Sequence, residues 1–597
     1  MHTAALVGKN GSIDWLCLPH FDSPSVFGAL LDEANGGFFQ VRPDTADVSE
    51  RQFYWPDTNV LVTRFFTEGG AAEVTDFMPV GPARAAPEHH EIIRLVTAVR
   101  GEVGLRAVCQ PAFDYARAEH KISLVAGGAR FEAPGIALGL AANVPLSVKG
   151  GAVVARFRLV ERQSAVFCLR ELDHTHGCGA QLSVDQVDRA FQQTVQYWRR
   201  WLAQCRYQGR WREVVRRSAL VLKLLTFEPT GAVIAAATTS LPEAIGGSRN
   251  WDYRYSWIRD SAFSLYALLK LGFSEEAARY MNFLQEICKR PGPVGPLQLM
   301  YGIDGRRTLT EQELPHLAGY RGSRPVRVGN AAYEQLQLDI YGEVIDAIYL
   351  FDKHAAPITH DTWNTVRTFV EWVIEHWRQQ DEGIWEVRGQ RRQFVHSKLM
   401  CWVALDRAIR TARRQSLPAD VVRWRQARDK VYEDIMKQAW NSERDAFAQS
   451  YGSNVLDAAI LMMPLMLFVS PVDHTMLRTI DAIMAPPRQG GLLSNNLVFR
   501  YNTAEAEDGL SGEEGTFNIC TFWLVEALTR AGRYNPERLE QARLIFERML
   551  GFANHLGLYA EQTGSKGEAL GNFPQAFTHL ALISAALNLD KTLGAGA

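Results

Sequence analysis

The sequence predicts a multidomain protein, with an N-terminal antiparallel β-sandwich, a linker helix and a C-terminal toroid of helices. Three observations lead to this prediction. The chain has 597 residues, more than one ordinary hydrophobic core organises. Short apolar runs with strand-like alternation, separated by glycines and prolines, fill roughly the first 180 residues. Beyond residue 211 the apolar residues recur at helical spacing almost to the end of the chain.

The N-terminal part shows the strand pattern most clearly at 61–66, 91–96 and 153–160. We therefore assign residues 1–182 to the β-sandwich. Ser183 then precedes apolar residues at steps of three and four, which indicates an amphipathic helix. We assign 183–210 to this linker helix.

The helical domain, residues 211–597, is predicted to contain twelve helices. Short turns make neighbouring helices antiparallel, and the longer loops follow every odd-numbered helix, so all long loops should meet at one mouth of a closed toroid with two rings. Functional residues concentrate on loops that a rigid scaffold holds, which makes that mouth the expected site. The predicted helices span 211–227, 254–271, 274–290, 339–354, 360–379, 395–413, 419–440, 454–468, 472–485, 517–532, 535–555 and 573–590.

Composition excludes several classes of function. Apolar residues make up 47% and charged residues 22% of the chain, as in globular proteins rather than disordered ones. A formal net charge of −2 gives no bulk attraction to nucleic acid or to an anionic membrane surface. No apolar run reaches 18 residues, no export signal is visible, and the eight scattered cysteines include no CxxC pair. We expect a cytoplasmic protein with reduced thiols and no nucleic-acid or membrane partner; the sequence leaves the oligomeric state open.

The first long loop, 249–260, carries two Trp, two Tyr, three Arg and two Asp within twelve residues. Aromatic faces stack on sugar rings, and Arg/Asp pairs hydrogen-bond to neighbouring hydroxyls. The loop therefore predicts a saccharide site. The alternative is a structural ion-pair cluster, with Asp260 capping the helix that follows.

Two further loops each carry a carboxylate in an apolar setting. Glu386 lies between Trp385 and Val387, which favours a protonated side chain, although a Glu beside a Trp is, taken alone, more often an ordinary surface residue. Glu561 follows an apolar stretch. Glycoside hydrolysis needs such a pair, one to protonate the leaving oxygen and one to activate water or attack carbon. Glu513 and Glu514 compete for the second role, although we favour capping and charge complementarity for them.

A metal site is not expected from the sequence. His174, His176 and Cys178 alternate and would share one face of a strand, but no matching second pair is evident. A metal-dependent toroid enzyme, such as a cyclase, would need clustered His, Cys or Asp ligands at the mouth. A non-catalytic carbohydrate-binding protein would keep the aromatic residues and could lose either carboxylate.

These segments resemble glycoside hydrolase family 15, the glucoamylases and the prokaryotic trehalases related to them. Residues 11–24 look like the N-terminal β-domain of its prokaryotic members, and 255–260 is similar to the YxWxRD segment of glucoamylases. Ile384-Trp385-Glu386 resembles the [LI]WE motif with the general acid, Ala560-Glu561-Gln562 the xEQ motif with the general base, and Arg500-Tyr501 the RY pair that contacts substrate. The resemblance covers nearly the whole chain, and the motifs occur in the family's order.

The resemblance implies an (α/α)6 barrel, inversion at the anomeric carbon and no obligatory cofactor. Glu386 would be the acid and Glu561 the base, with their carboxyl groups about 6.5–9.5 Å apart. The residues expected to bind the saccharide are Trp257, Arg259, Asp260, Trp385, Arg500 and Tyr501.

The substrate expected is a small α-glucoside, with trehalose preferred. Fungal glucoamylases carry a second Glu after the acid, where this chain has Val387, and no starch-binding module is visible after the toroid. Glucoamylase or other exo-α-glucosidase activity on maltooligosaccharides or isomaltose is the alternative. The loop 292–338 is expected to grip a second glucose through Arg321, Arg324, Arg327, Glu334 and Gln337.

Overall fold

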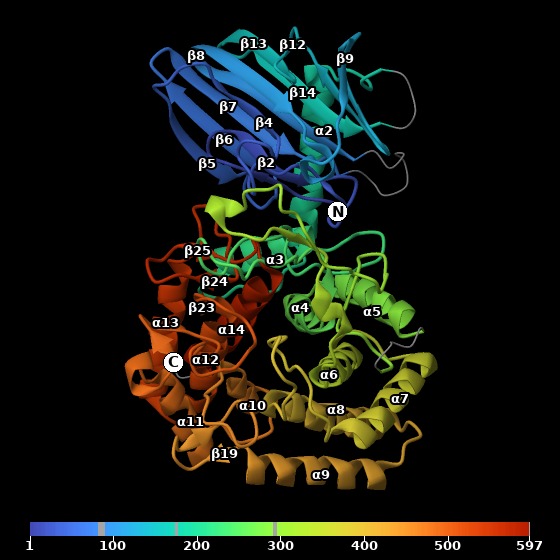
Figure 1. Cartoon of the computed structure of the whole chain (residues 1–597), viewed down its shortest axis with the longest axis vertical. Helices are drawn as coiled ribbons and strands as arrows, with labels where there is room; N and C mark the ends of the chain where they lie inside the picture. The colour runs from blue at the N-terminus through green and yellow to red at the C-terminus, as the bar shows by residue number, and fades with distance from the viewer. Residues whose placement is uncertain (81–89, 173–176, 290–294, 596–597) are drawn as a thin grey trace. The chain divides into compact units, whose positions relative to one another are not determined.

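A computed structural model describes residues 1–80, 90–172, 177–289 and 295–595 (Figure 1). The chain divides into two compact units. The first, here the β-unit, comprises Met1–Gln204 and Pro315–Arg321; the second, the helical unit, comprises Cys205–Leu314 and Gly322–Ala597. The predicted division into a sheet-rich N-terminal part and a helical C-terminal part is confirmed. None of the helices in the described ranges has both the length and the apolar character that crossing a membrane requires.

Fourteen strands of the described β-unit form one hydrogen-bonded antiparallel network. Its centre is the longest strand, β8, whose first half pairs with β7 and β14 and whose second half pairs with β4 and β13. Gly101 lies between the two halves with φ +66°, and a Cβ there would lie 2.3 Å from the Gly69 carbonyl oxygen, so this position requires glycine. The strands are β1 Ala5–Val7, β2 Ser12–Cys17, β3 Ser25–Phe27, β4 Phe38–Pro43, β5 Ser49–Tyr54, β6 Leu61–Thr67, β7 Gly70–Phe77, β8 Glu91–Gln110, β9 Lys121–Val125, β10 Gly128–Ala133, β11 Ile136–Ala142, β12 Ser147–Lys149, β13 Ala152–Val160 and β14 Ser164–Glu171.

The core of the β-unit is apolar and contains a buried ion pair between Arg94 and Asp76. Phe39, Phe131 and Phe167 are fully buried in it. The Arg94 guanidinium, also fully buried, donates to both carboxylate oxygens of Asp76 at 2.7 and 3.2 Å. It also donates to backbone carbonyls, so the charge is paired and hydrogen-bonded, the condition for a buried ion to be tolerated.

The helix predicted after Ser183 is α2, Val184–Leu202. Ser183 and Gln186 form a capping box: each side chain accepts the other residue's backbone N–H, at 3.2 and 2.8 Å. The apolar face that the spacing predicted is buried, including Phe191 and Trp198. Helix α2 belongs to the β-unit, as does the short helix α1, Phe113–Ala116.

The described helical unit contains twelve α-helices, α3 to α14. The predicted helix 454–468 is wrong in extent: a 3₁₀ turn, η3 (Ala458–Leu461), leads into the four-residue α10. The Asp457 side chain accepts the Ala459 N–H at 2.8 Å, so Asp457 is the N-cap residue directly before η3. The helices are α3 Arg212–Leu224, α4 Ile258–Leu271, α5 Ser274–Cys288, α6 Asp339–His354, α7 His360–His376, α8 Val395–Gln415, α9 Val421–Gln438, α10 Met462–Leu465, α11 His474–Met484, α12 Asn518–Ala531, α13 Pro536–Leu550 and α14 Ala576–Ala595.

Packing among these helices follows a cycle. Helix α4 packs against α6, α6 against α8, α8 against η3, η3 and α10 against α12, α12 against α14, and α14 against α4. The other helices pack on members of this cycle: α3 on α14, α5 on α4, α7 and α9 on α8, and α11 and α13 on α12. Gly272, in the left-handed region with φ +101°, ends α4 and starts the turn into α5. The long connections follow α3, α5, α7, α9, α11 and α13, and those after α3, α7, α11 and α13 contain residues of the site.

Candidate active site

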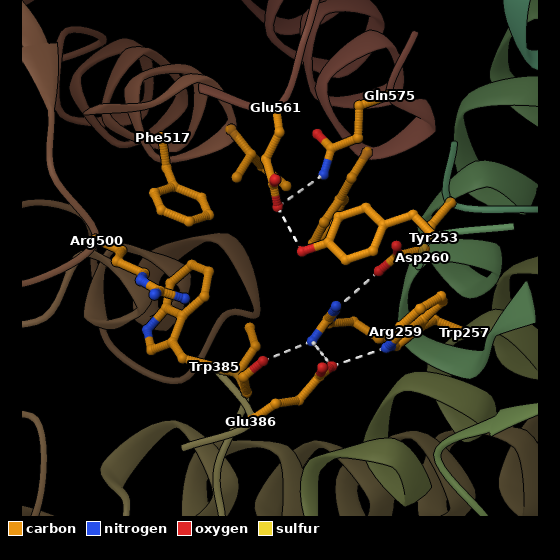
Figure 2. Close-up of a pocket in the computed structure, with 14 residues that line it drawn as sticks. Tyr253, Trp257, Arg259, Asp260, Trp385, Glu386, Arg500, Phe517, Glu561 and Gln575 are labelled. Atoms are coloured by element: carbon orange, nitrogen blue, oxygen red, sulfur yellow. Dashed lines mark hydrogen bonds and ion pairs between the residues drawn. The ribbon is translucent and has the colours of Figure 1, made fainter. Parts of the chain in front are cut away.

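A pocket lies in the helical unit and encloses about 450 Å³ of space when the adjoining open solvent is counted (Figure 2). Its walls come from four loop regions and the first turns of α4, α12 and α14, which bring together residues more than 300 positions apart. The lining combines aromatic rings with charged groups: Ala235, Tyr253, Trp257, Arg259, Asp260, Ile384, Trp385, Glu386, Arg500, Phe517, Ile519, Glu561, Gln575 and Phe577.

Glu386 projects from a tight turn between α7 and α8. Its backbone N–H donates to the Gly383 carbonyl at 3.1 Å, and its own φ is +57°. A residue with a side chain in this left-handed region costs about 1–3 kcal/mol, and such residues concentrate at functional sites. The turn thus holds the side chain at a position that a relaxed backbone would not give it.

The Glu386 carboxylate has two partners in the pocket. Trp257 Nε1 donates to Oε1 at 2.8 Å, and Arg259 Nη1 lies 3.5 Å from the same oxygen. Arg259 is itself fixed, because it donates to the Ile384 carbonyl at 2.6 Å and to Asp260 at 2.9 Å. Burial raises the pKa of Glu386, while Arg259 and the Trp257 hydrogen bond lower it; burial is the larger effect. The net result favours a protonated carboxyl.

Glu561 lies across the pocket from Glu386 (Figure 2). The Tyr253 hydroxyl donates to Glu561 Oε1 at 2.7 Å, and Gln575 Nε2 donates to the same oxygen at 3.5 Å. Burial raises the pKa of Glu561 well above its usual range and the Glu243 carboxylate raises it further, whereas the Tyr253 hydrogen bond lowers it. Glu561 is only 3% exposed, and a buried carboxyl with a perturbed pKa in a pocket is a candidate for acid–base catalysis.

Arg500 forms the wall beside Trp385 and Phe517. Its guanidinium makes a bidentate pair with Glu514, with Nε at 2.9 Å and Nη2 at 2.6 Å from the carboxylate oxygens. It lies 4.6 Å from the Phe517 ring centroid and 5.7 Å from that of Trp385. The Trp385 indole donates to both oxygens of Asp457 at 3.0 Å, which fixes the ring.

Some predicted residues lie outside the pocket. Tyr501 is not among the lining residues: its hydroxyl donates to Asp508 at 2.9 Å, and its ring lies 4.8 Å from the Arg500 guanidinium. Glu514 is occupied by Arg500 and Arg249, while Glu513 is exposed. These positions accord with a charge-pairing role for Glu514 rather than with the competing role as base.

The described part of the loop 292–338 contributes no lining residue to this pocket. Arg327, expected to grip a second glucose, packs 4.7 Å from the Trp251 ring centroid and pairs with Glu313 at 3.4 Å. The predicted grip on a second sugar has no counterpart in the pocket lining.

Sequence reasoning missed three lining residues that contact the two carboxylates or Arg259. Tyr253 was part of the aromatic loop but had no assigned role. Gln575 and Phe577, at the start of α14, had no motif; Phe577 lies 5.2 Å from the Arg259 guanidinium. The one signal that could have indicated them is their position: residues beside the ends of the inner helices, where the long loops are predicted to meet, should line the site.

Comparisons with known proteins match the chain over nearly its full length. The family model described as Glycosyl hydrolases family 15 matches residues 209–587, and the model described as Trehalase-like, N-terminal matches residues 1–149. A curated trehalase of Mycobacterium tuberculosis is 40% identical, with 99% of this chain and 88% of the relative covered. A curated trehalase of Thermoplasma acidophilum is 37% identical, with 98% of each chain covered.

A crystal structure of bacterial glucoamylase complexed with acarbose shares the fold, with a TM-score of 0.72 over 98% of this chain and 94% of that one, at 13% sequence identity. The resemblance seen in the motifs is therefore confirmed by the family model, by the whole-length relatives and by the fold. The chain is a glycoside hydrolase and belongs to glycoside hydrolase family 15.

Proposed function

We propose that this protein is an α,α-trehalase that hydrolyses trehalose to two glucose molecules with inversion. The reaction class rests on the two carboxylates that face each other across one aromatic pocket, Glu561 buried and Glu386 partly buried. The assignment of trehalose as substrate rests on the 35–40% identity to curated trehalases from both bacteria and archaea, over at least 98% of this chain.

Glu386 is proposed as the general acid. Burial raises its pKa, which favours the protonated form, and the Trp257 hydrogen bond and the strained turn hold the carboxyl toward the pocket. The proton passes to the glycosidic oxygen as its bond to the anomeric carbon breaks, and the first glucose leaves as a neutral alcohol.

Glu561 is proposed as the general base. Its carboxylate takes a proton from a water molecule, whose oxygen attacks the anomeric carbon on the face opposite the leaving group. The Tyr253 hydroxyl stabilises the ionised form before the water is deprotonated. Glu386 ends ionised and Glu561 protonated, so a proton exchange with solvent completes the cycle.

Trp257, Arg259, Asp260, Trp385 and Arg500 are proposed to hold the attacked glucose. The aromatic rings offer apolar faces, and the charged groups offer donors and acceptors for hydroxyls. Because Tyr501 stacks on Arg500 from outside the lining, we assign it to positioning Arg500 rather than to substrate contact. No cofactor takes part in this scheme.

The closed cycle of packed helices supports an (α/α)6 barrel, with α4, α6, α8, η3–α10, α12 and α14 as its inner ring. The turn of β8 from one set of partners to another supports a β-sandwich over about residues 1–182, followed by the linker helix. A cytoplasmic location is also part of the proposal; its support is that all eight cysteines are free.

A substrate panel tests the proposal. Initial rates on trehalose, maltose, isomaltose and starch should be highest on trehalose. Proton NMR of the first products should show equal amounts of α- and β-glucose, because inversion converts the attacked ring while the leaving ring keeps its configuration. Release of α-glucose alone would mean retention, and faster turnover of maltose or longer maltooligosaccharides would assign the enzyme to the glucoamylases.

A second substrate separates the roles of the two carboxylates. Glu386→Gln and Glu561→Gln should each lower the rate on trehalose by about 10²–10⁴-fold or more. On α-glucosyl fluoride, whose leaving group needs no protonation, Glu386→Gln should recover most of its activity while Glu561→Gln stays inactive. Recovery by Glu561→Gln instead would exchange the assignments.

A further inference from the structure

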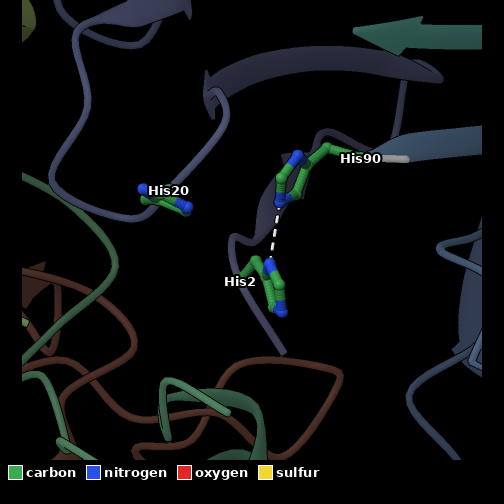
Figure 3. A group of neighbouring side chains, drawn as sticks. All are labelled: His2, His20 and His90. Carbon is green, nitrogen blue, oxygen red and sulfur yellow. Dashed lines mark hydrogen bonds between the residues drawn. The ribbon is translucent and has the colours of Figure 1, made fainter. Parts of the chain in front are cut away.

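We propose that His2, His20 and His90 form a binding site for a divalent transition-metal ion of the zinc class (Figure 3). One ring nitrogen from each histidine can be chosen so that all three lie within 4.8 Å of one another. All three side chains are partly buried in the β-unit. Imidazole nitrogen is a ligand that Zn²⁺, Cu²⁺ and Ni²⁺ prefer, whereas Mg²⁺ and Ca²⁺ prefer oxygen.

The three residues come from separate segments of the β-unit. His2 precedes β1, His20 follows β2, and His90 directly precedes β8. Their ring centroids lie 4.8, 5.6 and 6.1 Å apart. Imidazoles bound tetrahedrally to one ion, with metal–nitrogen distances of about 2.0–2.1 Å, have ring centroids about 5 Å apart. Small side-chain rotations would therefore bring the three nitrogens onto one ion.

Glu171 prepares His90 for this role. Its Oε2 lies 2.9 Å from His90 Nδ1, and the His90 side chain is only 11% exposed. With the proton assigned to Nδ1, donated to the carboxylate, Nε2 presents its lone pair toward the cluster. A carboxylate behind a ligating histidine fixes the ring and its tautomer and raises the basicity of the ligand. This arrangement is an observation independent of the clustering of the rings.

His90 Nε2 and His2 Nδ1 lie 2.7 Å apart, which is a hydrogen-bond distance (Figure 3). A metal ion would displace the shared proton, and the two nitrogens would move apart to about 3.3 Å, the separation of tetrahedral ligands at zinc distances. A hydrogen-bonded histidine pair alone would account for this distance but predicts no specific affinity for a metal. Binding, and its dependence on His20, distinguish the two readings.

No spacing pattern in the sequence points to this site, because the ligands are 18 and 70 positions apart. His174 and His176 lie outside the described residues, and Cys178, the third member of that candidate half-site, directs its thiol toward backbone carbonyls. The His2 cluster would instead join the segment before β1 to the loop after β2 and to the start of β8. An ion bound there should stabilise the fold, because the unfolded chain has no such site.

The test is a zinc titration of the full-length protein, purified without a histidine tag and treated with a chelator. In competition with a chromophoric chelator, one equivalent of Zn²⁺ should bind per chain, and the protein should melt at a higher temperature with the ion. Co²⁺ should give the visible absorption of a four-coordinate site. His20→Ala and His90→Ala should each weaken Zn²⁺ binding at least about 100-fold, and Glu171→Gln about 10–100-fold.

The matched control is His474→Ala, which removes a histidine whose side chain is 87% exposed and lies outside the cluster. This variant should bind Zn²⁺ as the parent does, and excess Mg²⁺ should not compete. Circular dichroism identifies any variant that fails to fold, and the His20 and Glu171 variants each test the site if His90→Ala does not fold. Equal binding by parent, His20→Ala and Glu171→Gln, or no binding by the parent, would overturn the proposal.

Discussion

Gly571 allows Glu561 to occupy its place in the pocket. A Cβ built at Gly571 would lie 2.4 Å from Glu561 Oε2 and 2.7 Å from Glu561 Cβ, well inside ordinary contact distance. Gly571→Ala must therefore push the carboxylate away by about 1 Å, a displacement that costs catalysis on the order of 100-fold. Gly571 also has φ +74°, so alanine adds about 1–2 kcal/mol of backbone strain.

The expected result is a loss of kcat of about 100-fold on trehalose, or on the best substrate of the panel, with a small loss of stability. Gly567→Ala is the control, because Gly567 has φ +83° but its Cβ would meet only a Phe552 ring carbon at 3.7 Å. This variant carries similar backbone strain without touching Glu561. If both variants lose the same small share of kcat, Gly571 does not position a catalytic group and the assignment of Glu561 as base is in error.

Three further substitutions each test what sets the pKa of one buried or partly buried group. Tyr253→Phe removes a donor that stabilises ionised Glu561, so the pKa of Glu561 should rise and the acidic limb of the kcat/KM profile should move about 1–2 pH units higher. Trp257→Phe removes the donor to Glu386, so the pKa of the acid should rise and the alkaline limb should move upward by a similar amount. His579 has a pKa lowered to about 3 by burial, whereas the unfolded chain takes up this proton below about pH 6.5. As the pH falls from about 6.5 to about 3, this group should therefore lower the free energy of unfolding by about 1.4 kcal/mol per pH unit. Urea denaturation of His579→Gln should show that this contribution to the slope is gone.

Two controls accompany the pH profiles. Tyr559→Phe removes another buried tyrosine hydroxyl outside the pocket lining, and the acidic limb should stay in place. Trp385→Phe removes an indole that donates to Asp457 rather than to Glu386, so KM should change while the alkaline limb does not move. A shift of either limb in its control would mean that general loss of packing, not the hydrogen bond to the carboxylate, sets the profile.

The sequence predicted most helices well, including α8 and α12, which are buried on nearly all sides. The starts and ends of most helices agree within a few residues, because the spacing of apolar residues is a local property. The prediction of 454–468 as one helix was wrong in extent, because helical turns begin only at Ala458 and end at Leu465. The Asp457 side chain caps the 3₁₀ turn η3 and so sets where it begins. The same carboxylate accepts the hydrogen bond of the Trp385 indole, which lines the pocket.

The pocket residues that followed motifs could be named in advance, but their partners could not. Glu514 pairs with Arg249, which is 265 positions away, and Tyr253 reaches Glu561 across 308 positions. No periodic pattern relates such residues, because their proximity arises only from packing of the whole helical unit. The left-handed backbone of Glu386 is likewise invisible in the sequence, since nothing in its neighbours requires it.

The closure of the helix cycle between α14 and α4 has a consequence for biosynthesis. Translation produces residues 258–271 long before 576–595, so the faces of α4 and α12 that pack against α14 stay uncovered until this last helix has been synthesised. Tyr253 has no partner carboxylate until Glu561 has been synthesised. Recovery of activity during refolding should consequently lag behind recovery of helical circular dichroism, since closing a loop of some 300 residues is slow beside helix formation. Enzymatic activity should therefore appear only after α14 has been synthesised and has packed against α4.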